Sequence, residues 1–82
     1  MSAADHRLEK HSVAIAGHRT SVTLEAAFWR ALKSIAKARG RSLSELIAEI
    51  DRGRGEIEPA PNLSSALRVY VLSQSSAPPG KA

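Results

Sequence analysis

The side chains of this sequence offer hydrogen bonds and positive charge, and little that could carry out a reaction. There is no cysteine, and the three histidines (His6, His11 and His18) stand at no spacing that metal ligands use. No nucleophile, base and orienting group suggest themselves as a set, and no glycine-rich loop is present to cradle a phosphate. We therefore expect neither an enzyme nor a bound metal or other cofactor, and the sequence favours a binding function.

The most regular set of hydrogen-bonding groups lies in residues 19–24, which alternate with the periodicity of a β-strand. One side of this strand would carry Arg19, Ser21 and Thr23, and the other would carry Thr20, Val22 and Leu24. A lone strand leaves backbone groups unpaired at both edges, and the only other candidate, residues 12–15, could be a short strand or an extended arm. The segment could be the edge of a larger sheet, but no convincing partner strand follows it. The simplest partner is the same strand of a second copy, which predicts a homodimer.

Positive charge is concentrated in the first half of the sequence, although the whole chain carries a net charge of only +4. Residues 25–41 hold five bases against one acid, whereas residues 42–58 hold five acids against two bases. This polarity suits an anionic partner at one face of the molecule. A basic helix face exposed to solvent would give the same pattern, so charge alone leaves both interpretations open.

Two amphipathic helices are expected after the strand. Phe28, Leu32 and Ile35 recur at helical spacing with Trp29 flanking them, and Gly40 is placed to end the helix in a left-handed cap. The sequence from Ser42 to Glu45 has the form of a capping box, which starts a second helix. The apolar residues expected to fill the dimer core are Val22, Leu24, Phe28, Leu32, Ile35, Leu46, Ile47 and Ile50.

The length of 82 residues allows one domain, and without disulfides or metals such a chain is marginal as a monomer. Residues 1–11 and 74–82 are expected to be disordered, and residues 12–73 to form the domain. Residues 52–61 contain two glycines and two prolines and are expected to be a linker. Residues 62–73 are expected to form an additional helix, although residues 69–72 would also suit a strand. The expected fold is mainly α with one short strand.

The order of strand, basic amphipathic helix, glycine turn and serine-capped helix resembles the ribbon-helix-helix (Arc/MetJ/CopG-like) DNA-binding domains. The stretch HRTSVTLEAAFWRALKSIAKARGRSLSELIAEI carries the general pattern, and the blocks GHRTSV and NLSSALR resemble a proteobacterial subgroup. The resemblance covers residues 12–73. It implies a β-α-α fold with an extra C-terminal helix, in an intertwined homodimer whose paired strands form a two-stranded antiparallel ribbon that enters the major groove of DNA.

The resemblance also implies roles for particular residues. Base contacts fall to Arg19, Ser21 and Thr23, and arginine can bind guanine through two hydrogen bonds. The start of the second helix, with its free amides, would hold a backbone phosphate. The residues expected to contact phosphates are His18, Arg41, Ser42, Leu43 and Ser44. With one arginine per strand, specificity would be modest or would depend on DNA shape.

The function implied is that of a transcription regulator, such as a repressor, that binds double-stranded DNA at the nucleoid in the bacterial cytoplasm. Dimers could assemble further along the DNA. The alternative is an antitoxin-like or adaptor dimer whose residues 62–73 bind a protein partner. No stretch approaches the roughly 20 apolar residues of a membrane span, and the first residues lack the apolar core of a signal peptide, so no membrane partner is expected.

Overall fold

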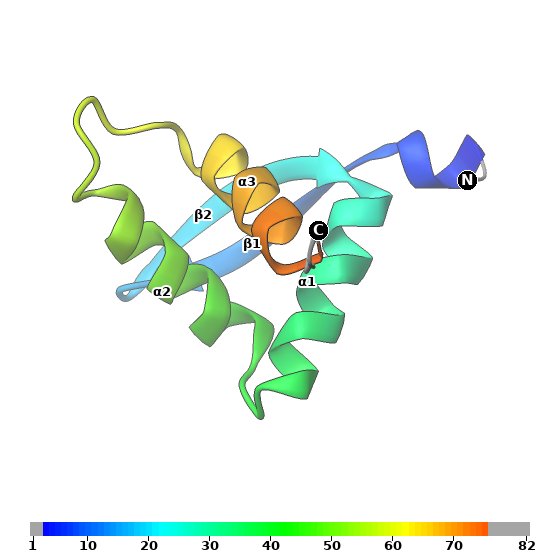
Figure 1. The fold of residues 1–82 in the computed structure, drawn as a ribbon, viewed down its shortest axis with the longest axis horizontal. Coiled ribbons are helices and arrows are strands. Elements are labelled where there is room, and N and C mark those ends of the chain that lie inside the picture. Colours follow the sequence, from blue (N-terminus) through cyan, green and yellow to red (C-terminus); the bar gives the residue numbers. More distant parts are fainter. Residues whose placement is uncertain (1–2, 76–82) are drawn as a thin grey trace, which may run out of the picture.

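Two antiparallel strands and three helices make up the fold (Figure 1). The computed structural model describes residues 3–75. A short 3₁₀ turn, η1 (Ala3–His6), precedes strands β1 (Leu8–Ile15) and β2 (His18–Glu25), and the helices are α1 (Ala26–Ala38), α2 (Leu43–Arg54) and α3 (Leu63–Ser75). No helix in this part of the chain is long and apolar enough to cross a bilayer.

The two strands form a hairpin within one chain. Their register runs from Leu8 opposite Glu25 to Ile15 opposite His18. The two residues of the turn, Ala16 and Gly17, both have positive φ angles, of 51° and 83°. Left-handed geometry at both central positions matches the right-handed twist of the flanking strands, and so closes a tight hairpin without splaying them.

This hairpin corrects two expectations from the sequence. The fold has two strands and not one, and β2 pairs with β1 of its own chain, so a lone strand no longer calls for a second copy. The N-terminal residues expected to be disordered, 1–11, include η1 and the first half of β1. Residues 76–82, most of the tail expected to be disordered, lie outside the described part of the chain.

The first half of β1 escaped detection because its inward side chains are polar. Glu9 and His11 stand where an alternating strand would place apolar residues. Trp29 of α1 compensates for this, because its indole N–H donates to the Glu9 carbonyl at 2.9 Å and its ring stacks on His11 at 4.2 Å between centroids. The first half of β1 therefore lacks the alternation of apolar residues that identifies a strand. It is held instead by contacts with Trp29, which lies 18 to 20 positions later in the chain.

The core lies between the inward face of the hairpin and the three helices. From the hairpin it takes Val13, Ile15, Val22 and Leu24, and from the helices Trp29, Leu32, Ala36, Leu46, Ile47, Leu67 and Val71. The buried stripe of α1 is therefore rotated from the expected one. Trp29, expected to flank the stripe, is only 1% exposed, whereas Phe28 and Ile35 are partly buried at its edge.

The junction between α1 and α2 follows the sequence prediction. Gly40 has a φ of 67°, and its amide and that of Arg41 donate back to Lys37 and Ala36, which closes a Schellman motif. The Ser42 hydroxyl accepts from the Glu45 backbone N–H at 3.1 Å, and the Glu45 carboxylate accepts from the Ser42 N–H at 2.8 Å. This is the predicted capping box, and it fixes where α2 begins.

The chain after α2 is more ordered than a linker. Helix α2 continues through Gly53 to Arg54, three residues into the segment expected to be irregular. The Arg54 guanidinium holds Asp51 at 2.6 Å and the Pro61 carbonyl at 3.2 Å, which fastens both ends of the loop to each other. These contacts, with residues three and seven positions away in the chain, offset the low helix propensity of glycine.

Helix α3 forms where it was predicted, and it belongs to the core of the domain. The Asn62 side chain caps it by accepting from the Ser65 N–H at 2.8 Å. Leu67 is fully buried, and the Ser64 hydroxyl donates to the Thr23 carbonyl on β2 at 3.2 Å. Removing residues 62–82 would therefore open the core as well as remove a possible partner surface.

The contacts of Trp29 with Glu9 and His11 on β1 give a first prediction. Trp29→Ala should cost roughly 3–5 kcal/mol, because it empties the largest buried side chain, and this approaches the total stability of a small domain. Trp29→Phe, which keeps an aromatic ring but loses the hydrogen bond to Glu9, should stay folded at lower stability. Thermal unfolding followed by circular dichroism measures both. A Trp29→Ala variant as stable as the parent would contradict this account of β1.

The capping box gives a second prediction, on acid stability. Donation from the Ser42 backbone N–H, and then from its side chain, lowers the pKa of Glu45. The stabilisation from this carboxylate is complete above pH 4.5, the ordinary value, and is lost as the pH falls through the lower value of the folded state. Glu45→Gln keeps a capping box without a titrating group, so its stability deficit relative to the parent should be larger at pH 7 than at pH 3.

Urea unfolding at the two pH values measures this deficit. The matched control is Glu56→Gln, since Glu56 is exposed and its side chain makes no hydrogen bond or ion pair with the described residues. The control should follow the parent at both pH values. A Glu45→Gln deficit that is the same at pH 3 and pH 7 would contradict the assigned role of the carboxylate.

Candidate nucleic-acid interface

The outer face of the hairpin is the part of the ribbon that the core does not use. Side chains alternate between the faces of a strand, and residues directly opposite on an antiparallel partner share a face. Since Val13, Ile15, Val22 and Leu24 point into the core, the residues between them point outward. Besides Leu8 at the far end of β1, the exposed residues of this outer face are Lys10, Ser12 and Ala14 on β1 and Arg19, Ser21 and Thr23 on β2. We call this set the ribbon face.

The three predicted base-contacting residues all lie on the ribbon face, on consecutive outward positions of β2. Short side chains occupy the centre of the face, where Ser12 stands opposite Ser21. Arg19 stands at the end near the turn, and Lys10 stands at the other end. No ion pair among the described residues involves either base, so both charges are available to an anionic ligand.

His18 lies beside the ribbon face and not on it. It follows the turn directly, opposite the buried Ile15, and its side chain is exposed because the hairpin ends there. From this position it can reach a group that passes the tip of the hairpin, but not one that lies along the centre of the face.

The start of α2, the second predicted site, is largely occupied by its own capping box. The Ser42 hydroxyl is bonded to the Glu45 N–H, and the Glu45 carboxylate lies on the Ser42 N–H. A carboxylate in the first turn of a helix complements the positive end of the dipole that would otherwise attract an anion. The amides of Leu43 and Ser44 are left as first-turn donors without an intrahelical partner.

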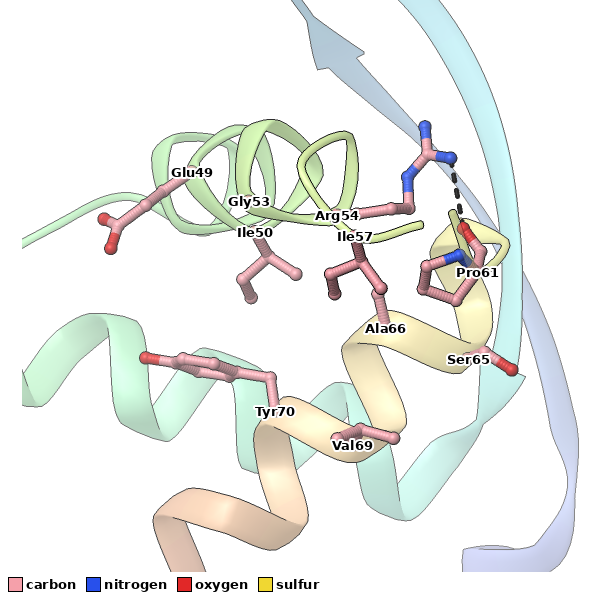
Figure 2. Close-up of a pocket in the computed structure, with 10 residues that line it drawn as sticks. All are labelled: Glu49, Ile50, Gly53, Arg54, Ile57, Pro61, Ser65, Ala66, Val69 and Tyr70. Carbon is pink, nitrogen blue, oxygen red and sulfur yellow. Dashed lines mark hydrogen bonds between the residues drawn. The ribbon is translucent and has the colours of Figure 1, made fainter. Parts of the chain in front are cut away.

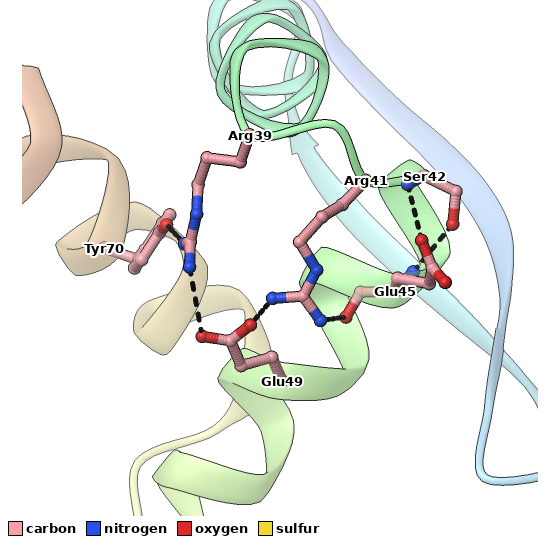
Figure 3. A network of polar contacts seen from close by, with 6 residues as sticks. All are labelled: Arg39, Arg41, Ser42, Glu45, Glu49 and Tyr70. Carbon is pink, nitrogen blue, oxygen red and sulfur yellow. Dashed lines mark hydrogen bonds and ion pairs between the residues drawn. The ribbon is translucent and has the colours of Figure 1, made fainter.

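Arg41 is engaged in a polar network that joins α1, α2 and α3 (Figure 3). It pairs with Glu49 and donates to the Glu45 carbonyl at 3.4 Å. Arg39 approaches the same Glu49 at 3.6 Å and donates to the Tyr70 hydroxyl at 2.6 Å. Glu49 of α2 therefore pairs with two bases that the sequence presents as free, and Figure 1 shows this turn well separated from the ribbon.

Sequence reasoning missed the β1 half of the ribbon face. Lys10, Ser12 and Ala14 are brought beside the predicted residues by the hairpin register. The available signal was the short alternation of these residues with Val13 and Ile15, which becomes recognisable as a strand only when it is read together with the two-residue turn Ala16-Gly17.

A second feature is an apolar groove between α2 and α3, with a volume of about 530 Å³ (Figure 2). Ile50, Ile57, Val69 and Tyr70 contribute to its lining, and the side chains of Ile57 and Val69 are 52% and 64% exposed. The described residues contain no group of three or more potential metal ligands in the groove or elsewhere. Its mostly apolar lining suits an apolar side chain.

The comparisons with known proteins agree with this fold. A family model described as a ribbon-helix-helix domain matches residues 8–75. A solved structure, of an uncharacterized protein from Bordetella pertussis Tohama I, superposes with a TM-score of 0.74 at 29% identity, and the match covers 98% of this chain and 70% of that one. None of the curated proteins compared with the chain matches it. Since the family model spans both strands and all three helices, the chain belongs to the ribbon-helix-helix domain family.

Proposed function

We propose that this protein is a transcription regulator that binds double-stranded DNA by placing the ribbon face in the major groove. Ribbon-helix-helix domains are commonly found in DNA-binding regulators. The observation that carries the proposal is the ribbon face itself, which is exposed, polar and basic while the opposite face of the same strands is buried. The major groove admits a two-stranded ribbon of this kind.

The proposed roles follow from the side chains of β2. Arg19 can bind the O6 and N7 acceptors of guanine with two hydrogen bonds, which is the commonest specific contact in the major groove. Ser21 and Thr23 can both donate and accept, and their short side chains let the backbone approach the bases closely. The exposure of all three residues leaves these groups free to reach base edges.

Phosphate contacts are proposed at His18 and at the Leu43 and Ser44 amides. His18 lies beside the hairpin turn, where a DNA backbone would pass a ribbon seated in the groove. Ser42 and Arg41 can contribute only by leaving the partners that hold them, Glu45 and Glu49. The proposed DNA contacts therefore depend mainly on the ribbon face and less on the start of α2.

We further propose that the protein acts as a homodimer, possessing one ribbon per chain, at the nucleoid in the cytoplasm. Ribbon-helix-helix domains typically form dimers. Of the eight residues expected in a dimer core, five are buried within the single chain, and Phe28, Ile35 and Ile50 remain partly exposed. A contact between copies would have to draw on these three residues and on exposed apolar residues such as Val69 and Leu72. A dimer would present two ribbons, which can reach major-groove segments one helical turn apart.

Arg19→Ala tests the proposal directly. The probe is the duplex recovered when the parent protein selects from a pool of random DNA, and gel retardation measures binding. Loss of a bidentate contact to guanine should weaken binding by about 5- to 150-fold, since it costs roughly 1–3 kcal/mol. Circular dichroism and sedimentation should be unchanged, because Arg19 touches nothing in the core.

Arg52→Ala is the matched control for that variant. Arg52 is an exposed base on α2 that forms no ion pair with the described residues, so the change removes the same charge away from the ribbon. It should bind the selected duplex nearly as well as the parent. If Arg19→Ala also binds like the parent, the ribbon does not read the DNA.

Salt dependence gives a further prediction. Each phosphate neutralised by the protein releases counterions, so the logarithm of the binding constant should fall with the logarithm of salt concentration, at about −0.9 per phosphate. With the ribbon and the start of α2 both in contact, titration from low to moderate salt should show a steep linear decline. A binding constant that does not change with salt would exclude DNA-backbone contact.

A further inference from the structure

The two strands of the hairpin carry the same pattern of side chains. Residues 10–15 of β1 read Lys-His-Ser-Val-Ala-Ile, and residues 19–24 of β2 read Arg-Thr-Ser-Val-Thr-Leu. Each is a base, a spacer, a serine, a valine, a small residue and an aliphatic residue. The offset of nine residues is the same at every position, so the two segments form an internal repeat.

The register places this repeat about a local two-fold axis. Ser12 stands opposite Ser21, and a rotation about an axis between them, normal to the sheet, exchanges the two strands. The rotation carries Lys10 onto Arg19, Val13 onto Val22 and Ala14 onto Thr23. Lys10 and Arg19 are therefore equivalent positions at diagonal corners of one ribbon.

We propose that Lys10 is a second specificity-determining residue: within the DNA segment that one hairpin contacts, Lys10 reads the bases at one end and Arg19 reads those at the other end. This rests on the proposed function, and it makes the hairpin of one chain a complete reading surface. Lysine, like arginine, can bind the O6 and N7 acceptors of guanine. The two remaining corners differ, because β1 has Ala14 where β2 has Thr23. The bases at the two ends of the contacted DNA segment are therefore expected to be related but not identical.

The backbone geometry brings the two strands of the ribbon face close together. Ala26 donates to the Arg7 carbonyl, so the pair next to Leu8–Glu25 is hydrogen-bonded. Hydrogen-bonded and non-hydrogen-bonded pairs alternate along an antiparallel ladder. The outward pairs, Lys10–Thr23, Ser12–Ser21 and Ala14–Arg19, are therefore non-hydrogen-bonded pairs, in which Cα atoms approach to about 4.5 Å. DNA within reach of Thr23 is therefore also within reach of Lys10.

The direction of Lys10 is fixed by its neighbours on β1. Strand alternation places Glu9 and His11 on the inward side, where the His11 ring stacks on Trp29 and the Glu9 carboxylate lies 3.2 Å from His11 Nε2. The acid of Glu9 is therefore turned away from the ribbon face, where it would repel DNA. The acid at the end of the outward row, Glu25, is paired with Arg68 at 3.0 Å. The face is left with two unpaired bases, one from each strand.

The test compares Lys10→Ala and Lys10→Arg with the parent on the selected duplex. Lys10→Ala should bind at least about fivefold more weakly, whereas Lys10→Arg, which keeps a donor for guanine, should recover most of that loss. Lys33→Ala is the matched control, because Lys33 is an exposed base on α1 without an ion pair to the described residues. It should bind like the parent, and circular dichroism should show all variants folded.

Base substitutions within the segment that one hairpin contacts then assign each residue to one end of that segment. Lys10→Ala should become indifferent to changes at one end, and Arg19→Ala to changes at the other. If Arg19→Ala loses binding while Lys10→Ala and Lys33→Ala both bind like the parent, the proposed function stands and β1 does not read DNA. If Lys10→Ala loses affinity equally for every sequence, Lys10 contacts only phosphate, and its role in specificity is overturned.

Discussion

The pairing of β1 with β2 is the interaction on which the rest of this structure depends. It satisfies one backbone edge of each strand, and it decides which side chains face the helices and which face solvent. Trp29 supports the pairing where β1 is polar, since its indole N–H donates to the Glu9 carbonyl and its ring stacks on His11. The side chains of Glu9 and His11 are 41% and 33% exposed, so the polar end of β1 lies at the edge of the core. The ribbon face is thus a consequence of how its opposite face is buried.

The ion pairs of the structure also determine which basic side chains remain available to a ligand. Arg39 and Arg41, at the turn between α1 and α2, share the single carboxylate of Glu49, and Arg39 also donates to the Tyr70 hydroxyl, so these contacts join the helices together. On the ribbon face, Lys10 and Arg19 form no ion pair with the described residues, and the only nearby outward acid, Glu25, is bound to Arg68. Exposed bases without an ion pair to the described residues also lie on α1 and α2, at Lys33, Lys37 and Arg52. Lys10 and Arg19 differ from these because they share one strand face with the hydrogen-bonding side chains of Ser12, Ser21 and Thr23.

Local signals predicted the parts of the fold that depend on local interactions. The helix end at Gly40, the capping box of Ser42 and Glu45, and the outward direction of Arg19 all follow from spacing within a few residues. The first half of β1 could not be predicted in this way, since its stability comes from Trp29 and from a register set by the turn. The ion pairs of Arg39 and Arg41 were hidden for the same reason, because their common partner lies on the next helix. The roles proposed at the DNA remain predictions for every residue of the site.

The most direct measurement of the central claim is an NMR titration of the labelled protein with the selected DNA duplex. Backbone amide signals of both strands, around Ser12 and Ser21, should shift together and with the largest amplitude. Signals lining the groove between α2 and α3, such as those of Val69 and Tyr70, should stay nearly unchanged. Shifts confined to α2 and α3, with the strands unaffected, would contradict the assignment of the hairpin as the DNA-binding element.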